Sequence, residues 1–362
     1  MRTLVVVNNI PTPYRSDLFR RMYCLAREYG YSMSVVYLAQ SESIRAGWNA
    51  DLEPYETILP IVFQGRIAST TTSDLIINRN YLRLLAGFDT ALFFGYSYPS
   101  IITSAAHRRL RRQPNILFCE STLVESKTSA PYRIGKVALL KLFDLYMTPG
   151  RRSKEYLEAI GVAPERIGIA PNASALTPSC PSTQATQTGM LRLLYVGRIA
   201  PEKRLISFVQ YLRVTEQSFT MSIAGSGPEA DTLRSIVGDD KRFTLLGSVP
   251  NSKLSAVYQA HDVLVLPSES ETWGFVVSEA VNHGLSLLLS DRIGCAPELL
   301  VDNGCLLKAI TPEDISCALS ELRTNLNNFK AASAQLSRKF TVDSQAHALL
   351  ACASKFSNLA RP

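Results

Sequence analysis

The sequence has no apolar run close to the ~20 residues that a membrane-spanning helix requires. It also has no N-terminal pattern typical of a secretory signal peptide. The first residues, MRTLVVVNNIP, hold one arginine and only a very short apolar run. We therefore interpret the N-terminus as a first β-strand and expect the protein to stay in the cytoplasm.

Patterns of disulfide and metal sites are missing as well. The seven cysteines are scattered, odd in number and without a CxxC pair, and the four histidines show no metal-binding spacing. Reduced and mostly buried thiols are therefore favoured over disulfides or a zinc site.

Hydrophobic residues make up 46% of the 362 residues, which is typical of a globular chain of two domains. The formal net charge is +7. Arginines gather in two clusters, which are Arg15, Arg20 and Arg21, and Arg108, Arg109, Arg111 and Arg112. Such clusters indicate solvated helix faces, or attraction to anionic lipid headgroups or a phosphate-bearing substrate. Nucleic acid is not an expected partner, because no recognition module or interleaved aromatic pattern is present.

Short apolar runs alternate with amphipathic stretches from the N-terminus onward. The pattern predicts strands at 3–7, 32–38, 90–94, 115–119, 145–147 and 167–169, with helices at 17–29, 101–110, 133–144 and 153–160. Two prolines assign residues 10–14 to a loop. Strand, helix and strand in succession form a βαβ unit, so the sheet is expected to be parallel.

Residues 173–190 are rich in Ser, Thr and Pro and have no apolar period, which predicts an interdomain linker. The alternation restarts at residue 191. It predicts strands at 191–196, 220–224, 243–246, 263–266 and 286–289, with helices near 204–217, 228–237, 252–261, 312–324 and 342–358. The fold class is therefore α/β, with a first domain at 1–172 and a second at 191–341.

Two glutamates separated by seven residues follow the apolar strand at 263–266. They are Glu271 and Glu279, in the stretch PSESETWGFVVSEAVNHG, and a helix starting near Gly274 would place Glu271 at its mouth. Two carboxylates beside the backbone N–H groups of a helix N-terminus can hold a polyhydroxylated, anionic ligand. A sugar nucleotide fits that description.

Three further motifs end strands of the second half. In VGRIAPEK, Arg198 and Lys203 indicate either surface charges or a clamp for a diphosphate leaving group. In AGSGP, Gly225 indicates a tight turn or a backbone that approaches a nucleotide, although the third glycine of a dinucleotide fingerprint is missing. In LGSVP, main-chain groups around Ser248 and Val249 are candidates to read a base edge. We interpret His261 and His283 as packing residues.

Taken in order, these motifs resemble the retaining GT-B glycosyltransferases, the large family that includes glycogen synthases, sucrose synthases and bacterial mannosyl- and glucosyltransferases. The resemblance is close over residues 190–305 and includes the family's Glu-x7-Glu motif, ETWGFVVSE. It implies a GT-B fold, two Rossmann-like domains whose parallel sheets face a central cleft. It also implies that the helix at about 342–362 crosses back onto the first domain.

The resemblance further implies that the protein needs neither a metal ion nor another cofactor, and it implies roles for the motif residues. Arg198 and Lys203 would neutralise the donor diphosphate in place of a metal ion, Glu279 would hold the ribose hydroxyls and Glu271 would contact the transferred sugar. Transfer would retain the anomeric configuration, with the departing phosphate oxygen taking the acceptor proton. The other implied donor-binding residues are Thr272, Trp273, Gly274, Phe275, Val276, Ser248, Val249, Gly225 and Asn172.

The first half matches the family less well. Where relatives carry glycines after the first strand, this chain has Pro11, Thr12 and Tyr14, which we expect to form an acceptor or phosphate loop. Where many relatives have a histidine, Glu120 is the candidate to orient the acceptor, or else a loop cap. Asn172 resembles the family's Pro-Asn-Gly, with alanine in place of the glycine.

The leading hypothesis is a retaining, metal-independent transfer of a sugar from a UDP- or GDP-sugar to a glycan or lipid-linked acceptor, in bacterial cell-surface polysaccharide synthesis. The basic first domain, with Lys136 and Lys141 on the helix at 133–144, would suit peripheral contact with an anionic inner membrane surface, although core packing is the simpler role of that helix. The alternatives are a sugar-nucleotide epimerase, which needs no acceptor, and a non-catalytic nucleotide-sugar-binding module.

Overall fold

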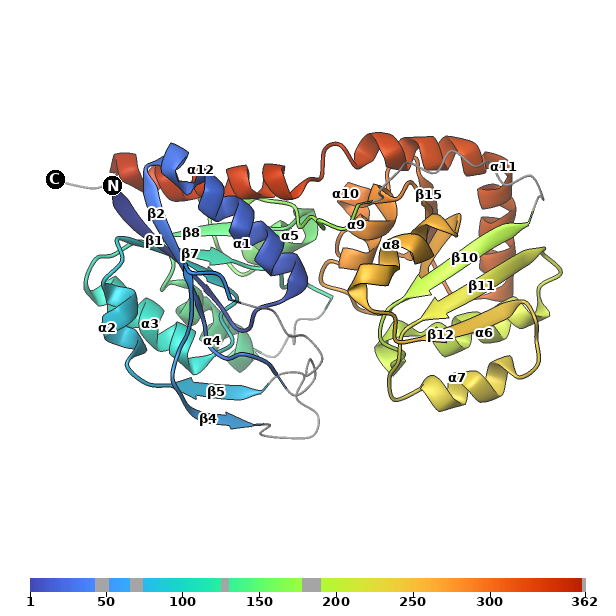
Figure 1. Ribbon diagram of the computed structural model, residues 1–362, viewed down its shortest axis with the longest axis horizontal. Helices are drawn as coiled ribbons and strands as arrows, with labels where there is room; N and C mark the ends of the chain where they lie inside the picture. Colours follow the sequence, from blue (N-terminus) through green and yellow to red (C-terminus); the bar gives the residue numbers. More distant parts are fainter. Residues whose placement is uncertain (43–51, 66–73, 125–129, 178–189, 360–362) are drawn as a thin grey trace. The chain divides into compact units, whose positions relative to one another are not determined.

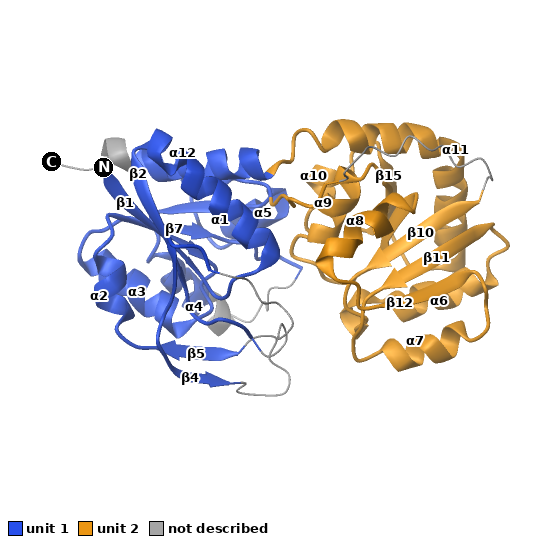
Figure 2. Cartoon of the chain, viewed as in Figure 1, with its two compact units in different colours: residues 1–171, 342–362 blue, residues 172–341 orange. Residues whose placement is uncertain are grey.

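The computed structural model describes residues 1–42, 52–65, 74–124, 130–177 and 190–359. Most of the predicted linker, at 178–189, lies outside the described residues, as do Cys180 and residues 360–362 of the predicted last helix. The chain has two compact units, Met1–Pro171 with Val342–Pro362 (unit 1) and Asn172–Thr341 (unit 2; Figure 2). No helix in the described part of the chain is long and apolar enough to cross a membrane.

Unit 1 is built on a seven-stranded parallel sheet with the order β3-β2-β1-β6-β7-β8-β9. Figure 1 labels β1, β2, β7 and β8 of this sheet. Its strands are β1 (Arg2–Asn8), β2 (Tyr31–Tyr37), β3 (Glu56–Ile58), β6 (Thr90–Phe94), β7 (Asn115–Phe118), β8 (Leu145–Thr148) and β9 (Ile167–Ile169). An antiparallel pair, β4 (Ile61–Gly65) and β5 (Leu75–Asn78), stands apart from it. The helices are α1 (Pro13–Leu25), α2 (Tyr81–Ala86), α3 (Pro99–Leu110), α4 (Ala130–Leu140), α5 (Arg151–Ala159) and α12 (Val342–Leu359).

Successive residues of β1 supply both cores of unit 1, because side chains of a strand point alternately to its two faces. Val5 and Val7 pack in a cluster with residues of α3 and α5. Leu4 and Val6 pack on the opposite face with residues of α1 and α12. The helix α12 is also fixed by polar contacts, since the Tyr31 hydroxyl donates to the Ala353 carbonyl at 2.9 Å.

The predicted arginine cluster at 108–112 is not one solvated face. Arg108 is wholly buried, while Arg111 and Arg112 are exposed and Arg109 pairs with Asp144. The Arg108 guanidinium donates to five acceptors at 2.6–3.2 Å, which are the carbonyls of Leu85, Phe88, Asp89 and Pro114 and Oδ1 of Asn115. A sequence pattern cannot reveal this, because the acceptors come from the end of α2, from the loop after it and from the start of β7.

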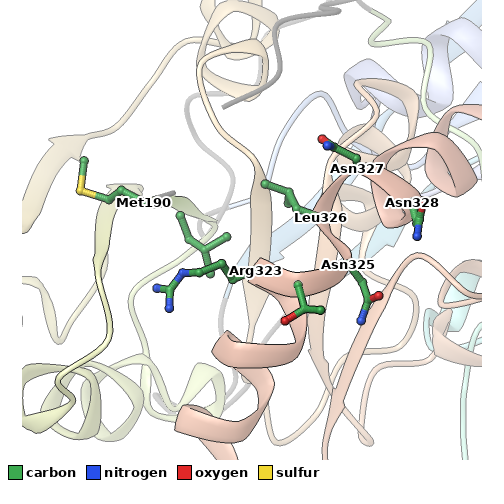
Figure 3. Close-up of a pocket in the computed structure, with 8 residues that line it drawn as sticks. Met190, Arg323, Asn325, Leu326, Asn327 and Asn328 are labelled. Atoms are coloured by element: carbon green, nitrogen blue, oxygen red, sulfur yellow. The ribbon is translucent and has the colours of Figure 1, made fainter. Parts of the chain in front are cut away.

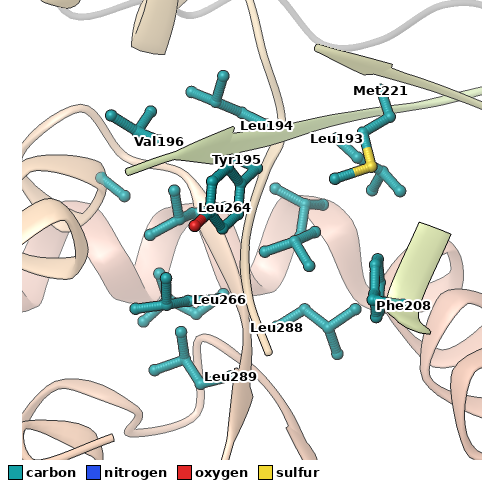
Figure 4. Packing of buried hydrophobic residues seen from close by; sticks show 14 of the residues in the cluster. Leu193, Leu194, Tyr195, Val196, Phe208, Met221, Leu264, Leu266, Leu288 and Leu289 are labelled. Atoms are coloured by element: carbon teal, nitrogen blue, oxygen red, sulfur yellow. The ribbon is translucent and has the colours of Figure 1, made fainter. Parts of the chain in front are cut away.

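Unit 2 is built on a six-stranded parallel sheet with the order β12-β11-β10-β13-β14-β15. The strands are β10 (Leu191–Val196), β11 (Phe219–Ala224), β12 (Phe243–Gly247), β13 (Val263–Leu266), β14 (Ser286–Ser290) and β15 (Gly304–Leu307). The helices are α6 (Leu205–Val214), α7 (Ala230–Val237), α8 (Asn251–Gln259), α9 (Phe275–Asn282), α10 (Ala296–Leu299) and α11 (Pro312–Leu336). Figure 4 shows how side chains of the central strands interlock with those of α6 and β11, including Leu193, Leu264, Phe208 and Met221.

Several predicted boundaries need correction. The helix α1 begins at Pro13, inside the predicted loop at 10–14, because proline is tolerated at the first helical position, where its missing N–H is not needed. The helix α11 runs to Leu336, beyond the predicted end at 324, and its buried residues tie it to the sheet of unit 2. The elements β3, β4, β5, α2, α10 and β15 were not predicted.

A buried carboxylate joins three elements of unit 2. Asp262, which precedes β13, is fully buried and accepts two bonds of 2.8 Å from Arg192 of β10 and one of 3.1 Å from Lys330 of α11. Burial by itself would raise the pKa of Asp262, but its bonds to the two cations outweigh burial and hold that pKa below its ordinary value.

We expect Asp262→Asn to lower the free energy of unfolding by about 3 kcal/mol at neutral pH, because it leaves two cations without their buried partner. An aspartate with a lowered folded pKa stabilises above its unfolded pKa, and this contribution is lost as the pH falls through the folded value. The difference between wild type and Asp262→Asn should therefore be constant from pH 8 to about pH 5 and shrink below about pH 4. Urea unfolding at several pH values measures it, with exposed Asp239→Asn as the control; a pH-independent difference would contradict the ion-pair explanation.

Candidate functional site

The loops after β10 and β11 in unit 2 lie against each other at the carboxyl edge of the sheet. The Ile199 N–H donates to the Ser226 carbonyl at 2.9 Å, and the Gly197 N–H donates to the Ala224 carbonyl at 3.0 Å. A Cβ atom on Gly225 would lie 1.8 Å from the Gly197 carbonyl oxygen. Gly225 is therefore required for the contact between the two loops, which explains the AGSGP motif without any ligand.

The two predicted cations follow β10, and each faces a carboxylate. Arg198 pairs with Glu202 at the surface, where both side chains are largely solvent-exposed. The Lys203 ammonium contacts a carboxylate oxygen of Glu271, with both side chains mostly buried at 16% and 22% exposure. The structure thus brings together the predicted phosphate-binding lysine and the first glutamate of the Glu-x7-Glu motif. An ammonium has three donors, so Lys203 keeps capacity for an incoming anion.

The Glu271 segment is held from behind by the residues that follow β14. The Gly294 N–H donates to the Glu271 carbonyl at 2.8 Å, and the Cys295 N–H donates to the Trp273 carbonyl at 3.2 Å. A Cβ atom on Gly294 would lie 1.8 Å from the Thr272 carbonyl oxygen, so this close approach requires glycine. The position of Glu271 is therefore set by backbone contacts and not only by its ion pair.

Of the predicted donor-binding residues around the start of α9, one is buried in the core and the others lie at the helix N-terminus. The Trp273 indole is buried in the core of unit 2, and its Nε1 donates to Ser278 Oγ at 3.3 Å, so it packs rather than facing a ligand. Gly274 precedes the first turn of α9, and Phe275 and Val276 in that turn are partly exposed. Thr272 is also partly exposed. The N-terminus of α9 and Glu271 thus lie within four residues of each other.

Glu279 lies further along α9 and is held by two hydroxyl groups. Tyr258 of α8 donates to Oε2 at 2.7 Å, and Ser174 donates to Oε1 at 3.4 Å. Burial raises the pKa of Glu279, while both hydroxyl bonds oppose that rise. Asn172 is buried beside the same helix, where its carbonyl accepts a bond of 3.4 Å from Ser278 Oγ. Sequence reasoning missed Tyr258 and Ser174, because neither belongs to a recognisable motif.

The histidines near this carboxylate have structural contacts. His283 follows α9, its Nδ1 lies 2.7 Å from the Glu279 carbonyl and its Nε2 lies 2.9 Å from Ser255 Oγ. Its ring stacks on Tyr258 with centroids 5.0 Å apart. His261 Nδ1 lies 2.6 Å from the Val257 carbonyl at the end of α8. Burial lowers the pKa of both histidines, so both are neutral at pH 7.

The predicted base-reading residues follow β12. Ser248 is exposed, and its hydroxyl lies 3.0 Å from that of Ser226. Val249 is partly buried and packs against the core of unit 2. The Gly225 N–H donates to the Gly247 carbonyl at 2.7 Å, which joins this loop to the AGSGP loop. The loops after β10, β11 and β12 are therefore linked along one edge of the sheet.

The predicted acceptor residues lie at the carboxyl edge of the sheet of unit 1. Glu120 follows β7, and its Oε1 lies 3.0 Å from a guanidinium nitrogen of Arg15, whose side chain is only 5% exposed. The Arg15 guanidinium also lies over the rings of Phe94 and Phe118, at 4.6 and 5.1 Å from their centroids. The sequence predicts Arg15 as part of a basic cluster, on a solvated helix face or attracting an anionic headgroup or phosphate, whereas the structure makes it a buried partner of Glu120.

The predicted loop at 10–14 is largely covered. Pro11 and Thr12 are buried, and Tyr14 is partly exposed in the first turn of α1, with the Arg15 guanidinium 5.5 Å from its ring centroid. The Thr12 carbonyl accepts from the N–H groups of Arg15 and Ser16 at 3.0 and 2.8 Å. Among the predicted acceptor residues Pro11, Thr12 and Tyr14, Tyr14 is therefore the one whose side chain remains accessible, and its neighbour Pro13 is exposed as well.

A cavity of about 280 Å³ lies elsewhere in unit 2, between the start of β10 and the middle of α11. Figure 3 shows Met190, Arg323 and Leu326 among the residues that line it. It lies at the amino end of β10, whereas the Gly197 loop lies at the carboxyl end. No predicted site residue lines it. The cavity is therefore separate from the candidate site.

Comparison with known proteins matches residues 191–325 to the family model described as Glycosyl transferases group 1. The chain is 28% identical over 195 residues to the O-antigen biosynthesis glycosyltransferase WbnH of Escherichia coli, which covers 54% of this chain and 55% of that protein. It is 32% identical over 139 residues to the sulfoquinovosyl transferase SQD2 of Arabidopsis thaliana, which covers 38% of this chain and 26% of that protein. The chain thus spans about half the length, or less, of these curated relatives.

Solved structures resemble the chain over nearly its whole length. HepE of Anabaena, solved in complex with UDP and glucose, has a TM-score of 0.72 at 14% identity, covering 99% of this chain and 100% of that one. The lipopolysaccharide outer core galactosyltransferase WaaB, solved in its apo form, has a TM-score of 0.70 at 14% identity, covering 98% and 99%. At this identity the likeness establishes the fold, which is two Rossmann-like halves of the GT-B type.

Proposed function

The chain has the GT-B fold and its residues 191–325 belong to the glycosyl transferases group 1 family, and from this premise we propose that it is a retaining glycosyltransferase that uses a nucleotide-diphosphate sugar. The observation that carries the proposal is the arrangement in unit 2. Lys203 contacts Glu271 beside the N-terminus of α9, while Glu279 is oriented on the same helix.

Each group has a defined task in this proposal. Lys203 and Arg198 bind the donor diphosphate and neutralise the charge that develops as it departs, which is the task a metal ion performs elsewhere. Glu271 orients Lys203 and contacts the transferred sugar, and Glu279 accepts hydrogen bonds from the ribose hydroxyls. The acceptor oxygen bonds to the anomeric carbon as the bond to the β-phosphate oxygen breaks, and the acceptor proton passes to that phosphate oxygen.

The acceptor is proposed to bind at the carboxyl edge of the sheet of unit 1. Glu120, fixed by Arg15, is suited to accept a hydrogen bond from a sugar hydroxyl. The names of the relatives support a glycan or lipid-linked acceptor in bacterial surface polysaccharide synthesis, because WbnH is described for O-antigen biosynthesis. We further propose a UDP- or GDP-sugar donor and a cytoplasmic location with peripheral contact at the inner membrane surface.

A donor panel tests the proposal. Purified protein is incubated with UDP-, GDP- and ADP-sugars, with and without short glycan acceptors, and nucleotide release is measured by chromatography. We expect release from one donor, faster with an acceptor, and unchanged within about twofold when EDTA removes divalent cations. Absence of both turnover and binding with every donor would refute the function, and complete loss on chelation would refute the metal-free mechanism.

A further inference from the structure

Two hydroxyl groups of the protein already occupy about half of the hydrogen-bonding capacity of the Glu279 carboxylate. An ionised carboxylate offers about four acceptor positions. Tyr258 occupies one on Oε2 and Ser174 occupies one on Oε1, at 2.7 and 3.4 Å. About two positions remain, one on each oxygen. Glu279 keeps partial exposure, so these positions can be reached by a pair of adjacent hydroxyl groups.

Tyr258 is itself fixed by burial and by contacts on α8 and α9. Its side chain is fully buried, and its ring stacks on His283. The His283 ring is fixed in turn at both nitrogens, by the Glu279 carbonyl and by the Ser255 hydroxyl. The Tyr258 phenol is fully buried and donates to a carboxylate oxygen of Glu279, so it has few alternative positions. The Tyr258 hydroxyl therefore restricts the rotation of the Glu279 side chain.

From this geometry we propose that Tyr258 is a positioning residue for ribose recognition, which orients Glu279 so that its remaining acceptor positions match the 2′- and 3′-hydroxyls of a ribonucleotide. The inference rests on the proposed function, because it takes the ligand of unit 2 to be a nucleotide. It goes further in making ribose discrimination depend on a tyrosine outside the family motifs.

The direct test compares the binding of UDP with 2′-deoxy-UDP, and of GDP with 2′-deoxy-GDP, by calorimetry. The wild-type protein should prefer the ribonucleotide by about tenfold or more, since a hydrogen bond to a charged group is lost with the 2′-hydroxyl. Tyr258→Phe should reduce that preference by about three- to tenfold, because a freely rotating carboxylate no longer matches the hydroxyl pair. The matched control is Tyr146→Phe in unit 1, which also removes a buried hydroxyl bond of 2.7 Å, there to the Leu140 carbonyl.

The pH dependence of the ribose preference is a second measurement, and it would not differ in Tyr258→Phe if Tyr258 had only a structural role. Protonated Glu279 loses acceptor positions, so ribose preference should fall as the pH drops through its pKa. Tyr258 opposes the effect of burial on that pKa, so the fall should occur at higher pH in Tyr258→Phe. The groups facing Glu279 are Tyr258, Ser174 and His283, and neutral His283 adds no charge. The phosphates of UDP and 2′-deoxy-UDP titrate alike, so their titration cancels in the ratio of the two affinities.

The outcomes separate the two proposals. If the wild-type protein binds none of the nucleotides, the proposed function fails and this inference fails with it. If it binds them and Tyr258→Phe keeps both the ribose preference and its pH dependence, the positioning role alone is overturned. If Tyr258→Phe does not fold, Ser174→Ala removes the hydroxyl bond to the other carboxylate oxygen of Glu279 instead. The inference would then be overturned if Ser174→Ala kept the wild-type ribose preference and if the ribose preference of the wild-type protein did not change with pH.

Discussion

Lys203→Ala is expected to lower kcat/KM for the donor found in the panel by about a hundred- to a thousandfold, the usual effect of removing one donor that stabilises developing negative charge. Lys203 is mostly buried and meets Glu271, so an alanine there leaves the site without the cation nearest to that carboxylate. Arg198 remains, but it lies in a largely exposed pair with Glu202. Initial rates across donor concentrations, at saturating acceptor, measure the change.

Two further variants make this result specific. Lys241→Ala removes an exposed lysine of the same unit and should leave kcat/KM within about twofold of wild type. Lys203→Ala also leaves Glu271 without its ion pair, so the double variant Lys203→Ala with Glu271→Gln removes that unpaired charge. The double variant should stay as inactive as the single one. Near-normal turnover in either would exclude Lys203 from charge stabilisation.

Arg108→Met is expected to destabilise unit 1 by roughly 4 kcal/mol or more, because it leaves several buried carbonyl acceptors without their guanidinium donor. Methionine fills a similar volume but donates no hydrogen bond, so the carbonyls of Leu85, Asp89 and Pro114 lose their guanidinium donors. Burial lowers the pKa of Arg108 to about 10, so the side chain is charged at pH 7 and its five bonds are charge-assisted. Thermal and urea unfolding of the full chain, followed by circular dichroism, measure the loss.

The control for this variant is its neighbour Arg111→Met. Arg111 is exposed just after the end of α3, so its replacement should change the free energy of unfolding by less than about 0.5 kcal/mol. Equal effects of the two substitutions would show that Arg108 contributes no more than a surface arginine. A large loss restricted to Arg108→Met would show that the basic cluster of the sequence contains a structural residue of unit 1.

The sequence predicted the central strands of unit 2 well because they are buried on both faces. Such strands form continuous apolar runs, and Leu191–Val196 and Val263–Leu266 have the predicted bounds. The pair β4 and β5 was missed because its apolar runs, at 61–63 and 75–77, are only three residues long and show no alternation of apolar and polar residues. In β4 four consecutive residues are exposed, so no alternation indicates a buried face. Pro13 was wrongly assigned to a loop, because the sequence alone does not distinguish a proline that starts a helix from one that interrupts it.

The candidate site was predicted only where the chain itself carries a motif. Glu271, Glu279 and Lys203 follow strands or begin a helix, so local sequence located them. Tyr258 and Arg15 were missed because their partners lie 21 and 105 residues away along the chain, and one fully buried tyrosine looks like another before the fold is known. Residues that support a site from behind are therefore the part that sequence reasoning reaches last.

The path of the chain through the two units also sets an order of events on the ribosome. The sheet of unit 1 is complete once residue 171 has emerged, yet α12, which covers Leu4 and Val6 together with α1, begins only at Val342. At roughly 5–20 residues per second, translation of the intervening unit 2 takes roughly ten to thirty seconds. Until α12 follows, unit 1 exposes an apolar face, whereas unit 2 has all of its residues as soon as Thr341 has emerged. We therefore expect unit 2 to be able to complete its fold before unit 1, which must wait for α12.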